Sequence, residues 1–282
     1  MKPVVILLLV LMQFFSADGG EKACNASVSG DTLKILTWNV YMLPMSVYHN
    51  SLKKPRAHDI VSILSKGKYD ILVLQETFQH GARKIISVGL KKIYPYQYGP
   101  LNSKFIQFRF NGGVYVLSKI PLKVMKQIVF HARTGYDKYA KKGAVLLEGY
   151  VNSKKFQIIG THIQSSAPRD IMNKQFQQIR SELLDPYMKD GVSQIISGDM
   201  NTNAHDNKEY TDMISILDTQ DGKLTGDKRF SKANGREIDY ILLRNNHSEA
   251  YVIQRNVVIF RPLNSRISEL SDHYGIEAEI VL

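Results

Sequence analysis

Cysteine is almost missing from this sequence, which contains a single one, Cys24, among its 282 residues. An intrachain disulfide is therefore excluded, and the fold has to be stabilised by its hydrophobic core. Internal repeats and low-complexity tracts are also lacking, which argues against a repeat protein or a disordered chain. What remains is the class of ordinary globular proteins.

The composition that is present describes one globular domain. Hydrophobic residues make up 44% of the chain and charged residues 22%, enough for a sizeable core. No shift in composition marks a linker, and two-layer β folds with helical cover often use such a length as one unit. We expect a short segment over residues 21–30, a single domain over residues 31–282, and a monomer.

The N-terminus is typical of a secretory signal peptide. Lys2 precedes an apolar run from Val4 to Phe15, and small and polar residues follow. The run has about a dozen residues, which is short for a hydrocarbon core of about 30 Å, so a permanent anchor is the less favoured alternative. We predict a signal peptide over residues 1–20, cleaved between Ala17 and Gly20, and a secreted protein, extracellular or periplasmic.

A formal net charge of +11 predicts a basic surface. Such a surface attracts anionic partners in general, including nucleic acid and acidic membranes. The charge alone does not choose between these partners.

Apolar runs of strand length recur along the chain, and many end in a polar residue. Five such runs cover residues 33–39, 70–76, 156–162, 194–201 and 237–243, and further strand candidates cover residues 112–119, 122–130, 143–151 and 251–260. Helical patterns cover residues 56–66, 82–92, 171–189 and 208–217. This alternation predicts packed sheets with helices outside.

Acidic, carboxamide and imidazole side chains follow successive strand candidates. They are Asn39, Glu76, His162, Asp199, Asn201, Asp239, Asp272 and His273. Such a set suits a hard divalent cation beside an acid/base pair. Each residue alone also has an ordinary interpretation, a solvated acid for Glu76 or a core histidine for His162.

Two of these sites have a local geometry that the sequence predicts. Gly198 predicts a tight turn, after which Asp199 and Asn201 would point the same way on an extended chain. In "SDHY", which stands just before an apolar strand, Asp272 and His273 are neighbours on an extended chain, so their side chains should diverge.

The order of these motifs resembles the endonuclease/exonuclease/phosphatase superfamily that includes DNase I, and bacterial sphingomyelinase C in particular. The residues that carry the resemblance are "DTLKILTWNVYMLP" from Asp31, "GGVYVLSKIPL" from Gly112, "IIGTHIQS" from Ile158, "SGDMNTN" from Ser197, "IDYIL" from Ile238 and "SDHYGIEAEI" from Ser271. The resemblance spans nearly the whole chain after residue 30. It implies an α/β fold, a four-layer α-β-β-α sandwich of two mainly antiparallel sheets.

The resemblance also implies a metal side of the site. Glu76 would be the main Mg²⁺ ligand, with Asn39 beside it and Asp272 nearby, and Mn²⁺ or Co²⁺ as other possible ions. Asp199 and Asn201 would lie around the metal and the scissile phosphate.

The acid/base roles come from the same resemblance. His273 would take a proton from the attacking water, and Asp239 would orient its imidazole. His162 would stabilise the phosphate in the transition state or help the alkoxide leave.

The aromatic-rich hairpin by which members of this family insert into membranes is reduced here. Ile259 and Phe260, flanked by Arg255, Arg261 and Arg266, could form a small apolar tip with a basic collar. A plain strand pair is the alternative for this segment.

The favoured function is therefore a secreted Mg²⁺-dependent phosphodiesterase that converts sphingomyelin to ceramide and phosphocholine. A secreted nuclease is the main alternative, because positive charge favours the phosphate backbone of nucleic acid. A phosphoinositide phosphatase would require a dedicated basic cluster that no motif reveals. A catalytically inactive lipid-binding module is disfavoured, because every expected catalytic position is filled.

Overall fold

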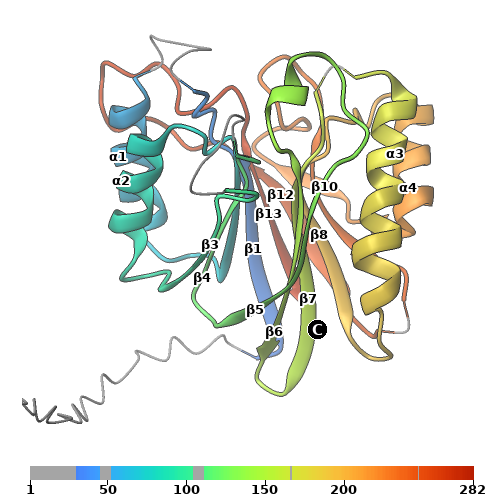
Figure 1. Ribbon diagram of the computed structural model, residues 1–282. Coiled ribbons are helices and arrows are strands. Elements are labelled where there is room, and N and C mark those ends of the chain that lie inside the picture. Colours follow the sequence, from blue (N-terminus) through green and yellow to red (C-terminus); the bar gives the residue numbers. More distant parts are fainter. Residues whose placement is uncertain (1–29, 45–51, 104–110, 166, 247) are drawn as a thin grey trace, which may run out of the picture.

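Two β-sheets pack face to face, and a pair of helices covers the outer side of each sheet (Figure 1). The computed structural model describes residues 30–44, 52–103, 111–165, 167–246 and 248–282. The expected signal peptide over residues 1–20 and Cys24 lie outside the described residues. The predicted four-layer α/β sandwich is confirmed.

The first sheet has seven strands in the order β10-β12-β13-β1-β2-β4-β3. They are β1 (Thr32–Asn39), β2 (Ile71–Gln75), β3 (Tyr96–Tyr98), β4 (Tyr115–Ser118), β10 (Leu224–Gly226), β12 (Tyr251–Val258) and β13 (Gly275–Val281). The pairs β1–β2 and β10–β12 are parallel, and the other pairs are antiparallel.

The second sheet has six strands in the order β5-β6-β7-β8-β11-β9. They are β5 (Leu122–Val129), β6 (Gly143–Val151), β7 (Lys154–His162), β8 (Ser193–Asp199), β9 (Thr219–Asp221) and β11 (Asp239–Arg244). Only β7–β8 is parallel among the pairs of this sheet in the described part of the chain.

Alternation along the central strands builds three apolar layers. In β1, Leu33 and Ile35 face the other sheet, whereas Leu36 and Trp38 face the helices, as expected for a strand covered on both sides. Complete burial of each such side chain stabilises the fold by about 1.5–3 kcal/mol. The strands that carry the site are therefore rigid.

The helices form at the predicted places with shifted ends. They are α1 (Lys53–Leu64), α2 (His80–Leu90), α3 (Arg169–Ile179) and α4 (Asn207–Leu217). Asp206 caps α4 by accepting a hydrogen bond from the backbone N–H of Glu209, 3.0 Å away. None of the helices in the described ranges has the length and apolar character needed to cross a bilayer.

The third helix differs from the continuous one expected over residues 171–189. After α3 the chain continues as a π-helical turn (Arg180–Leu184) and a 3₁₀ turn (Asp185–Tyr187). Pro186 lacks a backbone N–H, so a regular α-helix is not sustained through this position.

Candidate active site

The strand registers bring the predicted polar residues to one edge of the sandwich. Asn39 ends β1 opposite Gln75 at the end of parallel β2, and His162 ends β7 opposite Asp199 at the end of parallel β8. Asp239 begins antiparallel β11 opposite the same Asp199. The carboxyl ends of the parallel strands and the start of β11 therefore meet.

Glycine at position 198 is required by close packing within the sheet. A Cβ atom there would lie 2.1 Å from the carbonyl oxygen of Thr161 on β7. The predicted tight turn is therefore wrong, because Gly198 lies inside β8. The turn follows instead at Asn201, whose φ of 52° is left-handed.

An Asp–His pair is the best-defined element of the site. His273 Nδ1 lies 2.8 Å from Asp239 Oδ2, and both side chains are buried. The backbone N–H of Asp239 donates to Ser231 Oγ, and that of His273 donates to Ser271 Oγ. These bonds fix the imidazole and leave Nε2 as the ring nitrogen that does not contact Asp239.

The charge of this imidazole is set by two carboxylates. Burial alone would lower the pKa of His273, but Asp239 and Asp199 outweigh burial and raise it to about 9. Lys232 Nζ, 2.8 Å from Nε2, opposes this shift, because an ammonium only donates and so requires an unprotonated Nε2.

Asp199 connects the two sides of the site. Its Oδ2 accepts a hydrogen bond from Asn39 Nδ2 and its Oδ1 accepts one from the backbone N–H of Asn201, both at 3.0 Å. Burial would raise the pKa of Asp199, but His273 and the hydrogen bond from Asn39 outweigh burial and lower it. Asp199 is therefore a buried anion.

His162 lies on the far side of Asp199, against a lysine. Its Nε2 is 3.1 Å from Lys142 Nζ, and Lys142 Nζ is 2.8 Å from Asp137 Oδ2. Burial and the neighbouring Lys142 lower the pKa of His162 to about 3, so the ring is neutral. An ammonium only donates, so Nε2 accepts and Nδ1 carries the proton. The 3.5 Å approach of His162 to Asp199 is then not an ion pair.

Glu76 follows the fully buried strand β2 in a strained position. Its φ of 57° is left-handed, and the backbone N–H of Met42 donates to its carbonyl oxygen. Burial raises the pKa of Glu76, while a hydrogen bond with Asn39 opposes this effect. Its Oε2 is buried without a hydrogen-bond partner among the described residues.

The buried oxygen atoms without partners suit a hard divalent cation. Besides Glu76 Oε2, they include Asp239 Oδ1 and Asp272 Oδ1 within the described ranges. Uncompensated buried carboxylates are costly, and Mg²⁺ and Mn²⁺ prefer oxygen ligands. The donor set therefore fits the expected cofactor.

Two different sets of ligands are conceivable. Asp199, Asp239 and His273 place ligand atoms within 4.8 Å of one another, and neither Glu76 nor Asp272 belongs to this group in the part of the chain described. However, Asp239 and His273 already bond each other, and both oxygens of Asp199 are engaged. We therefore favour the side with Glu76 and Asn39 for the cation.

The expected divergence of Asp272 and His273 is wrong, because both side chains reach the same lysine. Asp272 Oδ2 lies 2.9 Å from Lys232 Nζ, and the same Nζ lies 2.8 Å from His273 Nε2. Lys232 therefore joins Asp272 to the expected base, His273. Asp272 and Glu76 both act electrostatically on buried Arg56.

Sequence reasoning missed both lysines of the site, Lys142 and Lys232. Nothing in their local sequence separates these two lysines from the remaining 35 of the 37 Lys and Arg residues. Their partners, His162 and His273, are 20 and 41 residues away along the chain. No local signal could have indicated these contacts.

The segment expected to form a membrane tip has a contact with the interior. The Phe260 ring packs on Trp38 with centroids 4.7 Å apart, and both residues line a cavity of about 130 Å³ that also touches His273. The basic collar is partly wrong, because Arg255 is buried and binds Asp221 and Glu237. Arg261 and Arg266 are exposed.

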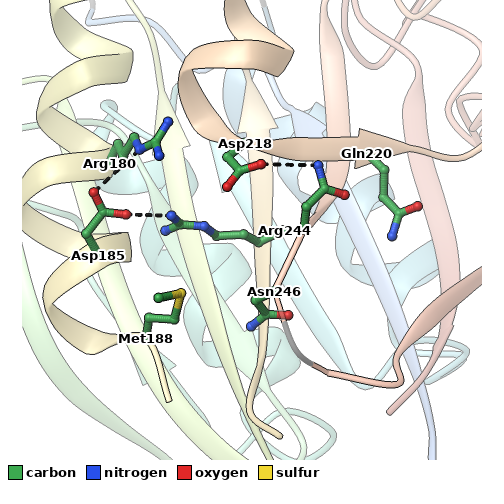
Figure 2. Close-up of a pocket in the computed structure, with 8 residues that line it drawn as sticks. Arg180, Asp185, Met188, Asp218, Gln220, Arg244 and Asn246 are labelled. Carbon is green, nitrogen blue, oxygen red and sulfur yellow. Dashed lines mark hydrogen bonds and ion pairs between the residues drawn. The ribbon is translucent and has the colours of Figure 1, made fainter. Parts of the chain in front are cut away.

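A second cavity, of about 510 Å³, lies at the other end of β8 and β11 (Figure 2). Arg180 and Arg244 both point to Asp185 there, and Asn245 donates to Asp218. The charges are thus paired among themselves, and none of the predicted catalytic residues lines the cavity. It is better explained as the junction of α3, α4 and β11.

Comparison with known proteins is consistent with this geometry. The model of the endonuclease/exonuclease/phosphatase family matches residues 36–273. Sphingomyelinase C 2 of Leptospira interrogans serogroup Icterohaemorrhagiae serovar Lai (strain 56601) is 31% identical over 289 residues, with coverage of 86% of this chain and 45% of that protein. Phospholipase C of Staphylococcus aureus is 28% identical over 323 residues, with coverage of 99% and 96%.

A solved structure is similar to this chain as well. A double mutant of Staphylococcus aureus beta toxin with bound magnesium ions matches with a TM-score of 0.76 at 26% identity, with coverage of 87% of this chain and 98% of that chain. The chain spans about half the length of the two Leptospira proteins that it matches.

Proposed function

We propose, from the premise that this chain belongs to the endonuclease/exonuclease/phosphatase family, that it is a phosphodiesterase acting on sphingomyelin. Water attacks the phosphorus, the bond to the ceramide oxygen breaks, and the products are ceramide and phosphocholine. The relatives named sphingomyelinase C and phospholipase C support this substrate. The observation that carries the proposal is the buried Asp239–His273 pair, which lies beside Asp199 where the strand ends meet.

His273 acts as the general base at Nε2. The Nδ1–H donates to Asp239, which fixes the tautomer and stabilises the imidazolium that forms. The raised pKa of His273 favours the protonated ring. A cation held by Glu76, Asn39 and Asp272 would lower this pKa and so favour the neutral base.

His162, Asp199 and Asn201 act on the phosphate side. Neutral His162 directs Nδ1–H, which has no partner among the described residues, toward charge that develops on phosphoryl or leaving oxygens. Asn201 is held by the bond from its Nδ2 to the carbonyl oxygen of Ile163, 3.0 Å away, and by its backbone bond to Asp199.

Glu76, Asn39 and Asp272 would hold a divalent cation, Mg²⁺ or alternatively Mn²⁺ or Co²⁺. A cation bound there neutralises phosphate charge and makes the alkoxide a better leaving group. The bound magnesium of the beta toxin structure supports Mg²⁺ as the physiological ion. Glu76 Oε2, which has no hydrogen-bond partner among the described residues, would then gain a partner.

The protein acts outside the cytoplasm and meets its substrate at a membrane surface as a monomer. Residues 1–20 would direct secretion, and Ile259 with Phe260 would form a small peripheral contact with the bilayer. Exposed Arg261 and Arg266 beside them would attract anionic headgroups.

The decisive assay measures phosphocholine release from sphingomyelin and from phosphatidylcholine by the mature chain, with Mg²⁺ and with EDTA. Release from sphingomyelin that depends on Mg²⁺ is expected. If neither lipid is cleaved and plasmid DNA is nicked under the same conditions, the nuclease alternative that the net charge of +11 favours would replace this proposal.

A further inference from the structure

The side chain of Lys232 blocks the nitrogen atom at which the proposed general base, His273, has to act. Lys232 Nζ lies 2.8 Å from His273 Nε2 and 2.9 Å from Asp272 Oδ2. His273 Nδ1 faces Asp239, so Nε2 is the ring nitrogen that faces the reaction. An attacking water and the Lys232 ammonium therefore compete for the same place.

The backbone of Lys232 is fixed to the strand that carries the base. Lys232 pairs with His273 in an isolated β-bridge. The backbone N–H of the next residue, Ala233, donates to the carbonyl oxygen of Asp272 at 2.9 Å. The neighbouring Ser231 accepts hydrogen bonds at Oγ from the start of β11. The root of the side chain is thus held at a constant distance from the catalytic pair.

The head of the side chain can move. The Lys232 side chain is 26% exposed, and four rotatable bonds separate its ammonium group from the fixed backbone. An ammonium that leaves His273 needs another acceptor, because a partly buried cation without partners is costly. A phosphoryl oxygen of the substrate, next to the attacking water, is the acceptor that the reaction supplies.

We propose that Lys232 is a phosphate-binding residue that caps His273 and Asp272 when no phosphodiester is present and moves onto a non-bridging phosphoryl oxygen when one binds. The ligand is the phosphodiester anion itself, whatever group it esterifies. The exchange frees Nε2 for water and Asp272 for the cation side at the moment when substrate arrives. The identity of the substrate in this inference rests on the proposed function, whereas the contact of Lys232 with His273 and Asp272 does not.

The test titrates inorganic phosphate into the protein by calorimetry in the presence of Mg²⁺. Lys232→Met keeps the length of the stem and removes the charge, and Lys232→Arg keeps the charge. Lys228→Met is the matched control, because Lys228 is exposed on the same segment and lies over Phe230 instead of the site. Thermal unfolding shows which variants are folded.

Loss of a charge-assisted hydrogen bond should weaken phosphate binding by about tenfold or more in Lys232→Met. Lys232→Arg should restore most of the affinity, and Lys228→Met should bind like the wild type. With bis-para-nitrophenyl phosphate as a soluble substrate, KM should rise in Lys232→Met more than kcat falls.

Unchanged phosphate affinity in folded Lys232→Met would overturn the proposal, and so would a higher kcat with unchanged KM, which would make the lysine a mere obstruction. The titration needs no turnover. A chain that binds phosphate through Lys232 but leaves sphingomyelin intact would support this inference and contradict the proposed function.

Discussion

At the scale of single residues, the site consists of buried charges whose partners are assigned atom by atom. Lys142 contacts His162 at Nε2, and Asp239 contacts His273 at Nδ1, so the partners of the two imidazoles lie at opposite ring nitrogens. Glu76 differs from both, because one of its oxygens has no partner in the described part of the chain.

Glu76→Gln should stabilise the metal-free protein and abolish its response to Mg²⁺. Burial raises the pKa of Glu76 in the folded protein above its pKa in the unfolded chain. The unfavourable contribution of Glu76 to folding is therefore absent below the unfolded-state pKa, grows up to the folded-state pKa and is complete above it. At pH 8, removing the charge should raise Tm in EDTA by about 2–4 °C for each kcal/mol recovered. Added Mg²⁺ should raise Tm in the wild type alone, and activity should be lost.

Differential scanning calorimetry of the two proteins, with and without Mg²⁺, checks this result. Glu249→Gln, an exposed substitution of the same kind, serves as the control. A Glu76→Gln protein that Mg²⁺ stabilises as strongly as the wild type would place the cation on the alternative set of Asp199, Asp239 and His273.

Asp239→Asn should shift the pH dependence of the reaction. His273 acts as a base when neutral, so activity is lost as the pH falls through its pKa, which carboxylates raise to about 9 in the metal-free protein. Removing one carboxylate lowers this pKa, so the acidic limb of kcat/KM should move to lower pH. The maximal kcat should fall by about 10²-fold or more, because the tautomer is no longer fixed.

The measurement is a pH profile of the wild type and the variant on a soluble phosphodiester, with Asp190→Asn as an exposed control. An acidic limb that stays in place would assign the base to another residue.

At the scale of elements, the parallel pairs β1–β2 and β7–β8 are decisive. Parallel strands end at the same edge, so residues separated by dozens of positions meet there. A buried cluster on β12, β9 and the approach to β11 supports this edge from behind. In it, Arg255 contacts Asp221 at 3.0 Å and Glu237 at 2.7 Å.

Arg255→Met should lower the free energy of unfolding by about 3–5 kcal/mol, because it leaves two acids buried without their cation. Burial already raises the pKa of Asp221 to about 6. Protonation relieves the remaining repulsion, so the loss should be smaller at pH 5 than at pH 8. Urea unfolding at both pH values tests this, with Arg261→Met as the exposed control. Equal losses at both pH values would contradict the electrostatic explanation.

At the scale of the whole molecule, the proposed function requires a basic protein to reach a lipid substrate at a membrane surface. The net charge of +11 favours approach to anionic membranes, and the segment with Ile259 and Phe260 lies beside the cavity that touches His273. Phe260 has two possible roles, as a bilayer contact and as a lid on Trp38.

Phe260→Ser should reduce action on sphingomyelin bilayers more than on detergent-dispersed sphingomyelin, because partition of an apolar side chain is lost only in the first case. Paired assays on vesicles and micelles, normalised to the wild type, measure the ratio. Similar losses on both substrates, together with a lower Tm, would assign Phe260 to packing on Trp38 and not to the membrane.

Much of the fold was predictable because its central strands are long and apolar. Three strands were not predicted, β3, β9 and β10, each of three residues, which is too short for a periodic pattern. The turn assigned to Gly198 was wrong for a related reason. Its lack of a side chain serves a close approach to Thr161 on the neighbouring strand, and contacts between strands leave no local signal.

By itself the sequence determined the strands and helices, the residues that follow the strand ends, and the family, because periodicity and motif order are properties of the chain. The tertiary structure decided which atoms of those residues meet. Lys232 on His273, Lys142 on His162 and Arg255 inside an acidic cluster are contacts between segments far apart in the chain. Such contacts depend on strand order and register, which bring distant residues together only once the two sheets have packed.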